Sequence, residues 1–303
     1  MTMASRVEVV GRAKINLFLA VGPRRLDGYH EVTSVMQSVD LADTLVLRPA
    51  ETPGVTFARG PGFDGDLPEP PDLVARALDL YRAEFPAAGP VAAEVSKGIP
   101  LAAGLAGGSA DAAAALVGAD ALRGGGASRL RLEAMCRELG SDAPFALRGG
   151  TALAGGRGEK LFPVSCPHRL WWVLGMPGFP LRTAEVYERH DEMATGSDLS
   201  PARAGGLVKA LAAGHPRGIA AALRNDLEGA AFDLAPPLAG LKEALRRAGA
   251  VGAVLTGSGP TIAALCRNEA HAEEVARRAE SAFARAEVVP SAEAGAEVVD
   301  REP

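Results

Sequence analysis

The sequence is poor in cysteine, and its few thiols are widely separated. Its 303 residues contain three cysteines, Cys136, Cys166 and Cys266, and no C-x-x-C pair. Such a set does not suit a zinc site or a disulfide framework, and it is typical of proteins in a reducing compartment. We therefore expect three structural thiols in a cytoplasmic protein.

Basic charge and long apolar runs are also scarce. The net charge of −5 offers no broad basic surface to a nucleic acid or an anionic membrane. No uncharged apolar run approaches the roughly 20 residues that a membrane helix needs, and the first residues lack the apolar core of a signal peptide. We expect no nucleic-acid or membrane partner, and a small-molecule ligand bound by a monomer or a homodimer.

Two common phosphate-binding motifs are missing as well. A Walker A loop requires G-x-x-x-x-G-K-[ST], but no Gly-Lys pair is followed by Ser or Thr in this chain. The dinucleotide fingerprint G-x-G-x-x-G is broken at its second glycine, where Ala106 follows Gly104 and Leu105. Any phosphate site must therefore be of another type.

A glycine-rich stretch at residues 100–109, PLAAGLAGGS, is the candidate for such a site, and it runs directly into an alanine-rich segment at 110–116. Glycine allows a ligand to approach the backbone, and Ser109 is expected to be the N-cap of the following helix. The first N–H groups of a helix lack internal partners and carry partial positive charge, so they attract anions such as phosphate. The alternative is a purely structural turn.

Three other segments place polar side chains beside turns or on a strand face. Lys14 and Asn16 fall on one face of the strand-like segment 12–21, where they indicate either the floor of a polar site or a half-solvated strand. Tyr29 and His30 follow a turn and could bind a base, or form a half-buried aromatic with a solvated neighbour. Asp142 follows the helix stop at Gly140, where the alternative is a surface acid.

The hydrophobic patterns predict an α+β protein with domains at residues 1–160 and 161–300 and a tail at 301–303. In the first domain we expect strands at 7–10, 12–21, 32–39, 44–47 and 91–95, helices at 73–81 and 132–139, and a surface loop at 51–72. In the second we expect strands at 170–174, 253–256, 261–265 and 287–289, with helices at 184–187, 202–213, 218–224, 237–248 and 270–285. This order is the β-α-β-β-α-β of the split ferredoxin-like pattern, with a frayed end after Val299.

Three motifs in a definite order resemble the GHMP small-molecule kinase superfamily, and the resemblance spans nearly the whole chain. They are AKINL at 13–17, the glycine-rich stretch at 100–109 and LTGSGPT at 255–261. Three further segments are similar to the branch that uses ATP to phosphorylate the 2-hydroxyl of 4-diphosphocytidyl-2-C-methyl-D-erythritol, in the non-mevalonate route to isopentenyl diphosphate. They are DGYHE at 27–31, GSDAPF at 140–145 and NDLE at 225–228.

The resemblance implies a GHMP kinase fold, with a ribosomal S5 domain 2-like ATP-binding domain, a ferredoxin-like C-terminal domain and the site between them. It implies that Asp142 is the general base, that Lys14 polarises the hydroxyl, that Asn16 and His30 hold the substrate, and that Tyr29 and Tyr187 stack on the cytosine. ATP is a substrate, and Mg²⁺ is expected to accompany it without a protein metal site. The ATP phosphates would be wrapped by Pro100, Leu101, Ala102, Ala103, Gly104, Leu105, Ala106, Gly107, Gly108, Ser109 and Ala110, with Gly257, Ser258 and Gly259 as a supporting loop.

Some positions depart from the family pattern. Ala102 and Ala106 replace common glycines, which predicts a stiffer loop. Asp72 replaces an asparagine that often contacts adenine, and a carboxylate cannot donate as an amide does. Met36 replaces an aromatic. The competing interpretations are a GHMP kinase for mevalonate, homoserine or a sugar, whose substrates carry no base to stack, and a non-catalytic nucleotide-binding regulator, which Lys14 and Asp142 disfavour.

Overall fold

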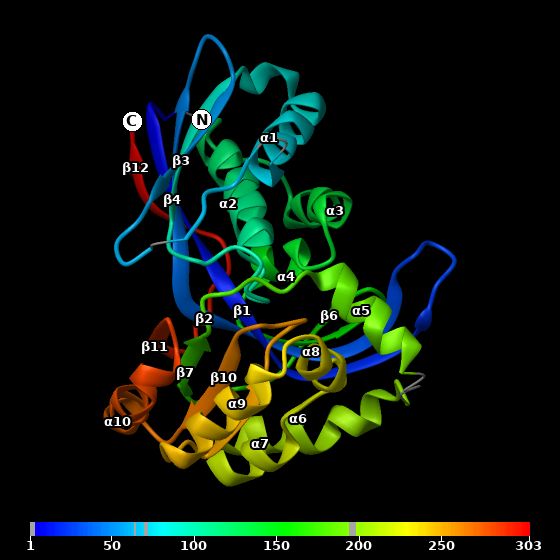
Figure 1. Cartoon of the computed structure of the whole chain (residues 1–303). Coiled ribbons are helices and arrows are strands. Elements are labelled where there is room, and N and C mark those ends of the chain that lie inside the picture. Colours follow the sequence, from blue (N-terminus) through cyan, green and yellow to red (C-terminus); the bar gives the residue numbers. More distant parts are fainter. Residues whose placement is uncertain (1–3, 64, 70–71, 194–197) are drawn as a thin grey trace.

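The computed structural model describes residues 4–63, 65–69, 72–193 and 198–303. Two β-sheets form its centre, and helices cover them (Figure 1). The first sheet belongs mainly to the N-terminal half of the chain and the second to the C-terminal half. The α+β class expected from the sequence is confirmed, because the helices cover two sheets whose strands pair mainly antiparallel.

Two long antiparallel strands, β1 (Arg6–Arg24) and β2 (His30–Pro49), form the frame of the first sheet. The sequence predicted two shorter strands in place of each. The strands are continuous because register shifts absorb the breaks: Arg12 pairs with Ala42, but Lys14 pairs with Ser38. Such bulges bend a strand and redirect its side chains, and here the bulge adjoins Lys14.

The remaining strands of the first sheet join this pair in the order β12-β1-β2-β4-β3, with β5 beside β2, β6 beside β5, and β8 beside β1. Their bounds are β3 (Gly54–Arg59), β4 (Val91–Lys97), β5 (Thr151–Gly155), β6 (Lys160–Pro163), β8 (Arg224–Asn225) and β12 (Glu297–Glu302). Strand β3 pairs in parallel with β4, so the surface loop expected over 51–72 is wrong for residues 54–59. Residues 64, 70 and 71 of that stretch lie outside the described residues.

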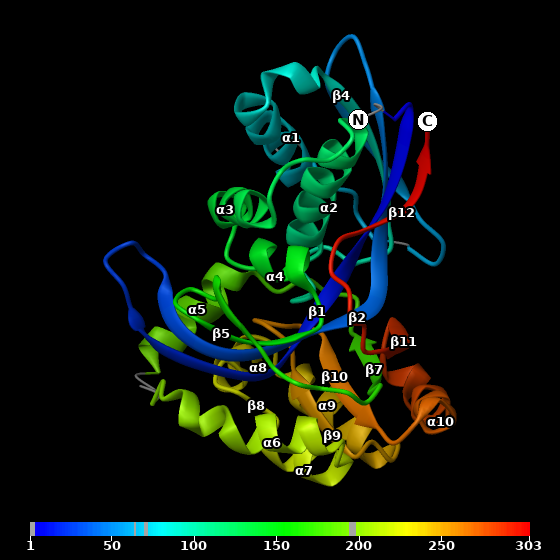
Figure 2. The same cartoon turned by 180° about the vertical axis from the view of Figure 1, so that it is seen from behind.

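The last strand, β12, pairs with β1, as Figures 1 and 2 both show. Arg301 lies opposite Val7, and Glu302 opposite Arg6. The expectation of a frayed end after Val299 and a tail at 301–303 is therefore wrong. Without β12, one edge of β1 would expose unpaired backbone groups, which natural sheets avoid.

Helices α1 to α4 belong to the N-terminal half, and α2 packs on β1 and β2 (Figure 1). Alanines 112–115 of α2 are fully buried, and such small side chains allow a close approach of helix and sheet. Helix α3 begins after Ser128, whose hydroxyl accepts from Arg131 N at 3.3 Å, and it ends before Gly140, the helix stop expected from the sequence. The bounds are α1 (Leu73–Glu84), α2 (Gly107–Leu122), α3 (Arg129–Leu139) and α4 (Ala143–Arg148), with a 3₁₀ turn at Pro86–Ala88.

The second sheet has the order β11-β7-β10-β9, and all neighbouring strands are antiparallel. Its strands are β7 (Trp171–Met176), β9 (Gly252–Leu255), β10 (Ile262–Cys266) and β11 (Arg285–Pro290). The ferredoxin-like β-α-β-β-α-β order is confirmed. The helices are α5 (Thr183–Glu192), α6 (Gly205–Ala213), α7 (Pro216–Ala222), α8 (Glu228–Leu234), α9 (Pro237–Arg247) and α10 (Glu269–Ala279), with 3₁₀ turns at Pro201–Ala204 and Glu280–Ala282.

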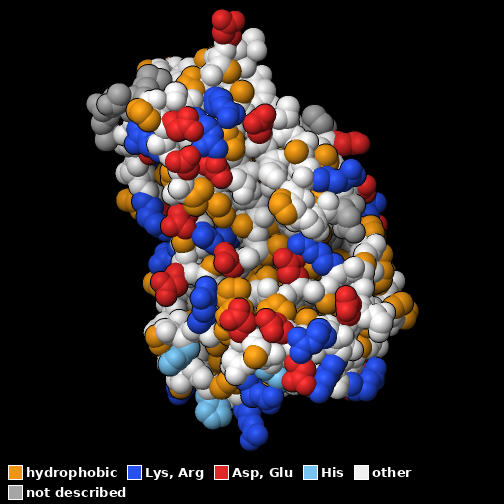
Figure 3. Space-filling view, turned by 90° about the vertical axis from the view of Figure 1, so that its left-hand side faces the viewer, with side chains coloured by type: hydrophobic (Ala, Val, Ile, Leu, Met, Phe, Trp, Pro, Cys, Tyr) orange, Lys and Arg blue, Asp and Glu red, His pale blue; other side chains and the backbone are white. Residues whose placement is uncertain are grey.

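The thiols and the surface agree with the composition. Cys136 and Cys266 are buried, and burial raises the pKa of each thiol to about 12, whereas Cys166 is half-buried. On the face shown in Figure 3, acidic and basic side chains are interspersed. Among the described helices, none combines the length and the apolar character needed to cross a membrane.

Candidate active site

A cavity of about 280 Å³ lies where the first sheet, the glycine-rich stretch and the loop after β9 meet. The structure brings many of the predicted site residues to its wall. They are Lys14, Asn16, Asp142 and Tyr187, residues Pro100, Leu101, Ala102, Ala103, Gly104, Ala106, Gly107 and Gly108 of the stretch, and Gly257 and Ser258 of the supporting loop. Leu105, Ser109, Ala110 and Gly259 do not line this cavity.

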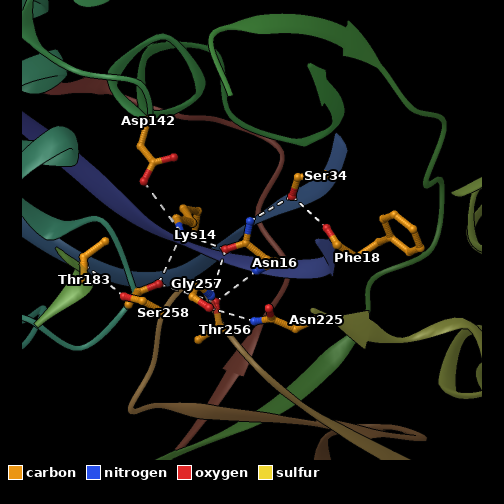
Figure 4. A network of polar contacts seen from close by, with 11 residues as sticks. Lys14, Asn16, Phe18, Ser34, Asp142, Thr183, Asn225, Thr256, Gly257 and Ser258 are labelled. Atoms are coloured by element: carbon orange, nitrogen blue, oxygen red, sulfur yellow. Dashed lines mark hydrogen bonds and ion pairs between the residues drawn. The ribbon is translucent and has the colours of Figure 1, made fainter. Parts of the chain in front are cut away.

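Lys14 lies on β1, and the protein holds its ammonium group in place. Its Nζ donates to Asn16 Oδ1 at 2.7 Å and to the carbonyl oxygen of Gly104 at 3.2 Å, and it lies 3.7 Å from Asp142 Oδ2 (Figure 4). A lysine has three donors, so two are occupied by neutral oxygens and one remains. The arrangement offers a fixed positive charge to an oxygen beside Asp142.

Asp142 occupies the N-cap position of α4, but its side chain makes no capping hydrogen bond. Pro144 in the first turn of α4 has no N–H to satisfy, so the helix can begin without that cap. The carboxylate is 36% exposed and is directed towards Lys14 instead (Figure 4). The carboxylate forms part of the cavity wall, which favours a role in the site over a surface acid, and that role stays a prediction.

Asn16 connects Lys14 to the C-terminal half. Its Oδ1 also accepts from Gly257 N at 3.0 Å, and its Nδ2 donates to Ser34 Oγ at 2.8 Å (Figure 4). One amide hydrogen remains for a ligand. Asn225 holds the same loop from the other side, since its Nδ2 donates to the carbonyl oxygens of Leu255 and Gly257, both at 2.7 Å. Neither contact could be read from the sequence, where Ser34 has no distinguishing pattern and Asn225 stands only within the NDLE segment.

Helix α2 begins at Gly107, and its N-cap is Ala106, so the prediction that Ser109 is the N-cap is wrong. Ala106 adopts the left-handed conformation, with φ 58°, which turns the chain into the helix earlier than expected. No side chain caps this helix. Its first N–H groups are thus left for an anion, as a phosphate site requires.

The glycine-rich stretch is closely packed against the loop after β9. A Cβ atom on Gly104 would lie 2.4 Å from the carbonyl oxygen of Thr256, so only glycine fits there. Ala102 also has a positive φ, of 50°, a region that costs alanine about 1–2 kcal/mol. The backbone of this stretch is therefore strained at two alanines, Ala102 and Ala106. That these alanines make the loop stiffer stays a prediction.

A second cavity, of about 500 Å³, adjoins the first and shares with it Val32, Asp142, Arg157, Thr183 and Tyr187. Tyr29 and His30 line this second cavity. His30 Nε2 lies 2.8 Å from Asp191 Oδ1, and its ring packs against Tyr187 with centroids 4.9 Å apart. The predicted aromatic residues are therefore brought together around one space.

The two tyrosines of this cavity differ in environment. Tyr29 is 51% exposed, and the guanidinium carbon of Arg157 lies 4.6 Å from its ring centroid. Burial, and secondarily the charge of Asp142, raises the pKa of the Tyr187 hydroxyl, so this ring stays neutral. Arg157 and Asp191 could not be singled out from the sequence, because the turn at 155–158 shows only its glycines and gives no sign that its arginine lines a cavity.

A buried ion cluster lies beneath the glycine-rich stretch and was also missed. Lys97 Nζ contacts the carboxylate of Asp43 and lies 2.5 Å from Asp111 Oδ2 on α2. Asp43 Oδ1 accepts from the backbone N–H groups of Gly98 and Ile99 at 2.6 and 2.8 Å. Burial, and then the charge of Asp43, raises the pKa of Asp111 well above its usual value. The cluster joins the start of the stretch to α2.

Two of the positions that depart from the family pattern have structural partners. Asp72 is the N-cap of α1, and its Oδ1 accepts from Ala75 N at 2.8 Å. Met36 is buried against Phe145 and also lines the first cavity. Within the described ranges, no group of three His, Cys, Asp or Glu side chains gathers to hold a metal ion.

Comparisons with known proteins agree with this architecture. The GHMP kinases N terminal domain matches residues 72–150, and the GHMP kinases C terminal model matches residues 207–285. The 4-diphosphocytidyl-2-C-methyl-D-erythritol kinase of Thermobifida fusca is 44% identical over 91% of this chain and 92% of its own length. The kinase of the same name from Streptomyces coelicolor is 39% identical over 95% of this chain and 97% of its own length.

Solved structures of similar fold differ in their sequence identity to this chain. A crystal structure of 4-(cytidine 5'-diphospho)-2C-methyl-D-erythritol kinase has a TM-score of 0.77, 34% identity, and coverage of 94% of this chain and 98% of its own. A homoserine kinase from Cytophaga hutchinsonii has the same TM-score of 0.77 at 22% identity, covering 99% of both chains, which shows the fold alone. Sequence identity over nearly the full length therefore decides the branch. The chain belongs to the GHMP kinases and, among them, to the 4-diphosphocytidyl-2-C-methyl-D-erythritol kinase family.

Proposed function

We propose that this kinase transfers the γ-phosphoryl group of ATP to the 2-hydroxyl of 4-diphosphocytidyl-2-C-methyl-D-erythritol, giving the 2-phosphate and ADP, in the non-mevalonate route to isopentenyl diphosphate. One observation carries the proposal. Asp142 lines both the cavity of the glycine-rich stretch and the cavity of Tyr29, His30 and Tyr187. A carboxylate at that junction can reach the hydroxyl of a substrate whose cytosine lies in the second cavity, while ATP lies in the first.

Asp142 acts as the general base in this proposal. Its carboxylate takes the proton of the substrate hydroxyl while the hydroxyl oxygen attacks the γ-phosphorus and the bond to the ADP oxygen breaks. The free N-cap position supports this role, because the carboxylate is not occupied by the helix it precedes. Phosphoryl transfer depends mainly on such positioning and on charge stabilisation.

Lys14 supplies the positive charge for the same oxygen. Two of its donors are held by Asn16 and Gly104, so the ammonium group does not have to reorganise as the hydroxyl loses its proton. Fixed donors of this kind stabilise charge more effectively than mobile ones. Asn16 acts chiefly by orienting Lys14, with one amide hydrogen left for the substrate.

ATP phosphates would occupy the start of α2, where the N–H groups lack a side-chain cap. Mg²⁺ would accompany ATP and supply charge neutralisation for the phosphate oxygens. Among the described residues no group of three acidic, histidine or cysteine side chains gathers beside this helix start, so the ion would be coordinated mainly by phosphate and water oxygens.

The cytosine would lie in the second cavity, between the rings of Tyr29 and Tyr187, with His30 at its edge. The lining of that cavity by all three side chains supports this placement. Offset stacking of aromatic rings contributes about 0.5–1.5 kcal/mol per pair beyond area burial. Asp191 fixes the imidazole of His30 through its Nε2.

An ADP-release assay tests the proposal. The purified protein is given ATP and Mg²⁺ with 4-diphosphocytidyl-2-C-methyl-D-erythritol, mevalonate or homoserine in parallel. We expect turnover with the cytidine compound and little with the other two. Faster turnover of mevalonate or homoserine would overturn the substrate assignment, and absence of turnover with all three would favour a non-catalytic regulator.

A further inference from the structure

Arg157 is a cationic side chain at the junction of the two cavities. It lies in the turn between β5 and β6, is half-buried, and lines both the cavity of the glycine-rich stretch and the cavity of Tyr29 and His30. Its guanidinium carbon lies 4.6 Å from the centroid of the Tyr29 ring. Arg157 has no role in the proposed phosphoryl transfer.

Several arginines around the second cavity are paired with carboxylates, whereas Arg24 and Arg157, which line it, form no ion pair within the described residues. Of these two, only Arg157 also lines the cavity of the glycine-rich stretch. Arg25 pairs with Asp27 and Glu31 on the neighbouring hairpin, and Arg189 pairs with Asp233 and Glu192. Among the described residues no carboxylate forms an ion pair with Arg157. A half-buried cation without a counter-ion is costly to maintain, so its position favours an anionic ligand.

The place of Arg157 matches one part of the proposed substrate. Tyr29, His30 and Tyr187 bound the side of the base, and Lys14 with Asp142 bounds the side of the reacting hydroxyl. A linker that joins base and acceptor must pass the residues common to both cavities. In a nucleoside-diphosphate-linked polyol that linker is the diphosphate.

We propose that Arg157 binds the diphosphate of the acceptor substrate and thereby selects nucleoside-diphosphate-linked alcohols; this inference rests on the proposed function. The planar guanidinium presents two parallel donors to phosphate oxygens, whereas a lysine offers a point charge. Stacking on Tyr29 fixes the plane of the guanidinium and leaves its edge free. Arg157 is thus a specificity-determining residue for the acceptor rather than for ATP.

Binding of a graded ligand series tests the inference without turnover. Cytidine, CMP and CDP are titrated by calorimetry into the wild type, Arg157→Met, Arg157→Lys and the control Lys160→Met, with a non-hydrolysable ATP analogue saturating the ATP side. Lys160 is exposed, three residues further on, and lines neither cavity, so its variant loses the same charge. Thermal unfolding checks that each variant is folded.

We expect wild type and Lys160→Met to bind CDP at least tenfold more tightly than cytidine. Arg157→Met should lose most of that ratio while its affinity for cytidine changes little, and Arg157→Lys should keep part of it. In turnover, Arg157→Met should raise KM for the cytidine substrate by about 10- to 100-fold, the scale of one or two charge-assisted bonds, with KM for ATP unchanged.

Three results would overturn the inference: an unchanged CDP-to-cytidine ratio in Arg157→Met, no preference for CDP in the wild type, or an equal loss for cytidine and CDP. The last would mean that Arg157 only supports the ring of Tyr29. Failure of the proposed function is distinguishable, because the wild type would then release no ADP from the cytidine substrate while the binding series still reports on Arg157.

Discussion

Lys14 Nζ lies 3.7 Å from Asp142 Oδ2, although the two residues come from a sheet strand and from the start of a short helix 128 positions further along the chain. The separation is longer than a direct hydrogen bond. The two charges therefore attract each other, while a donor of Lys14 and the acceptor oxygens of Asp142 stay available to a substrate. A hydroxyl in contact with both groups can give its proton to the carboxylate, and the ammonium can stabilise the negative charge that develops on the hydroxyl oxygen.

Replacing the carboxylate tests this relationship. Asp142→Asn should lower kcat by about 10²–10⁴, the scale of losing a general base, with the fold unchanged because the side chain makes no capping bond. Initial rates and thermal unfolding measure the two effects. Asp79→Asn, an exposed change on α1, is the control. Near-normal turnover of Asp142→Asn would remove Asp142 from the role of base.

Tyr29 provides a separate test of base recognition. Tyr29→Ala should raise KM for the cytidine substrate much more than KM for ATP, because the ring lines only the second cavity. Leu26→Ala on the same hairpin is the control, since that side chain is fully exposed and lines neither cavity. Equal effects of Tyr29→Ala on both substrates would mean that the ring has a structural role.

The residues of the candidate site could be picked out because they fall in short motifs with recognisable local structure. Lys14 and Asn16 share a strand face, and Asp142 follows the helix stop at Gly140, as the sequence indicated. The ferredoxin-like half was also predictable, since its apolar strands are short and bounded by turns. These features depend on interactions between neighbouring residues in the sequence.

Apart from the start of α2, the missed features depend on long-range contacts. Pairing of β12 with β1 joins the two ends of the chain, and the ends carry no local pattern that requires it. Lys97, Asp43 and Asp111 are fully or almost fully buried, yet a charged residue is normally expected at the surface. Arg157 acquires its place only because β5 and β6 direct their connecting turn towards Tyr29.

The left-handed alanines predict a stabilising change. Ala102→Gly and Ala106→Gly should each raise the free energy of unfolding by roughly 0.5–1 kcal/mol, because relief of about 1–2 kcal/mol of strain exceeds the added entropy of the unfolded glycine. Urea denaturation measures the change. Ala121→Gly, near the end of α2, should instead lower stability by about 1 kcal/mol. Destabilisation by Ala106→Gly would show that its methyl group outweighs the strain.

The buried cluster beneath the glycine-rich stretch predicts a pH dependence of stability. One cation, Lys97, faces two carboxyl groups that are removed from water. Asp111 Oδ1 is buried without a hydrogen-bond partner, and burial together with the charge of Asp43 raises the pKa of Asp111 well above its usual value. The folded protein therefore keeps a proton on Asp111 at pH values where the unfolded chain has released it.

This difference fixes the sign of the effect. As pH rises from about 4, the ordinary carboxyl value, towards the raised pKa, the unfolded chain gives up the proton and the folded protein does not, so the free energy of unfolding falls. Asp111→Asn carries an amide of the same shape and no titrating proton. Relative to the wild type, the free energy of unfolding of Asp111→Asn should rise by about 1.4 kcal/mol per pH unit within that window.

Urea denaturation of the wild type and Asp111→Asn in half-unit steps between pH 4.5 and 7.5 measures this difference in stability. Asp43→Asn, which weakens the acceptor of the Gly98 and Ile99 N–H groups, should be destabilised throughout. Parallel curves for wild type and Asp111→Asn would mean that Asp111 ionises in the folded protein as it does in the unfolded chain.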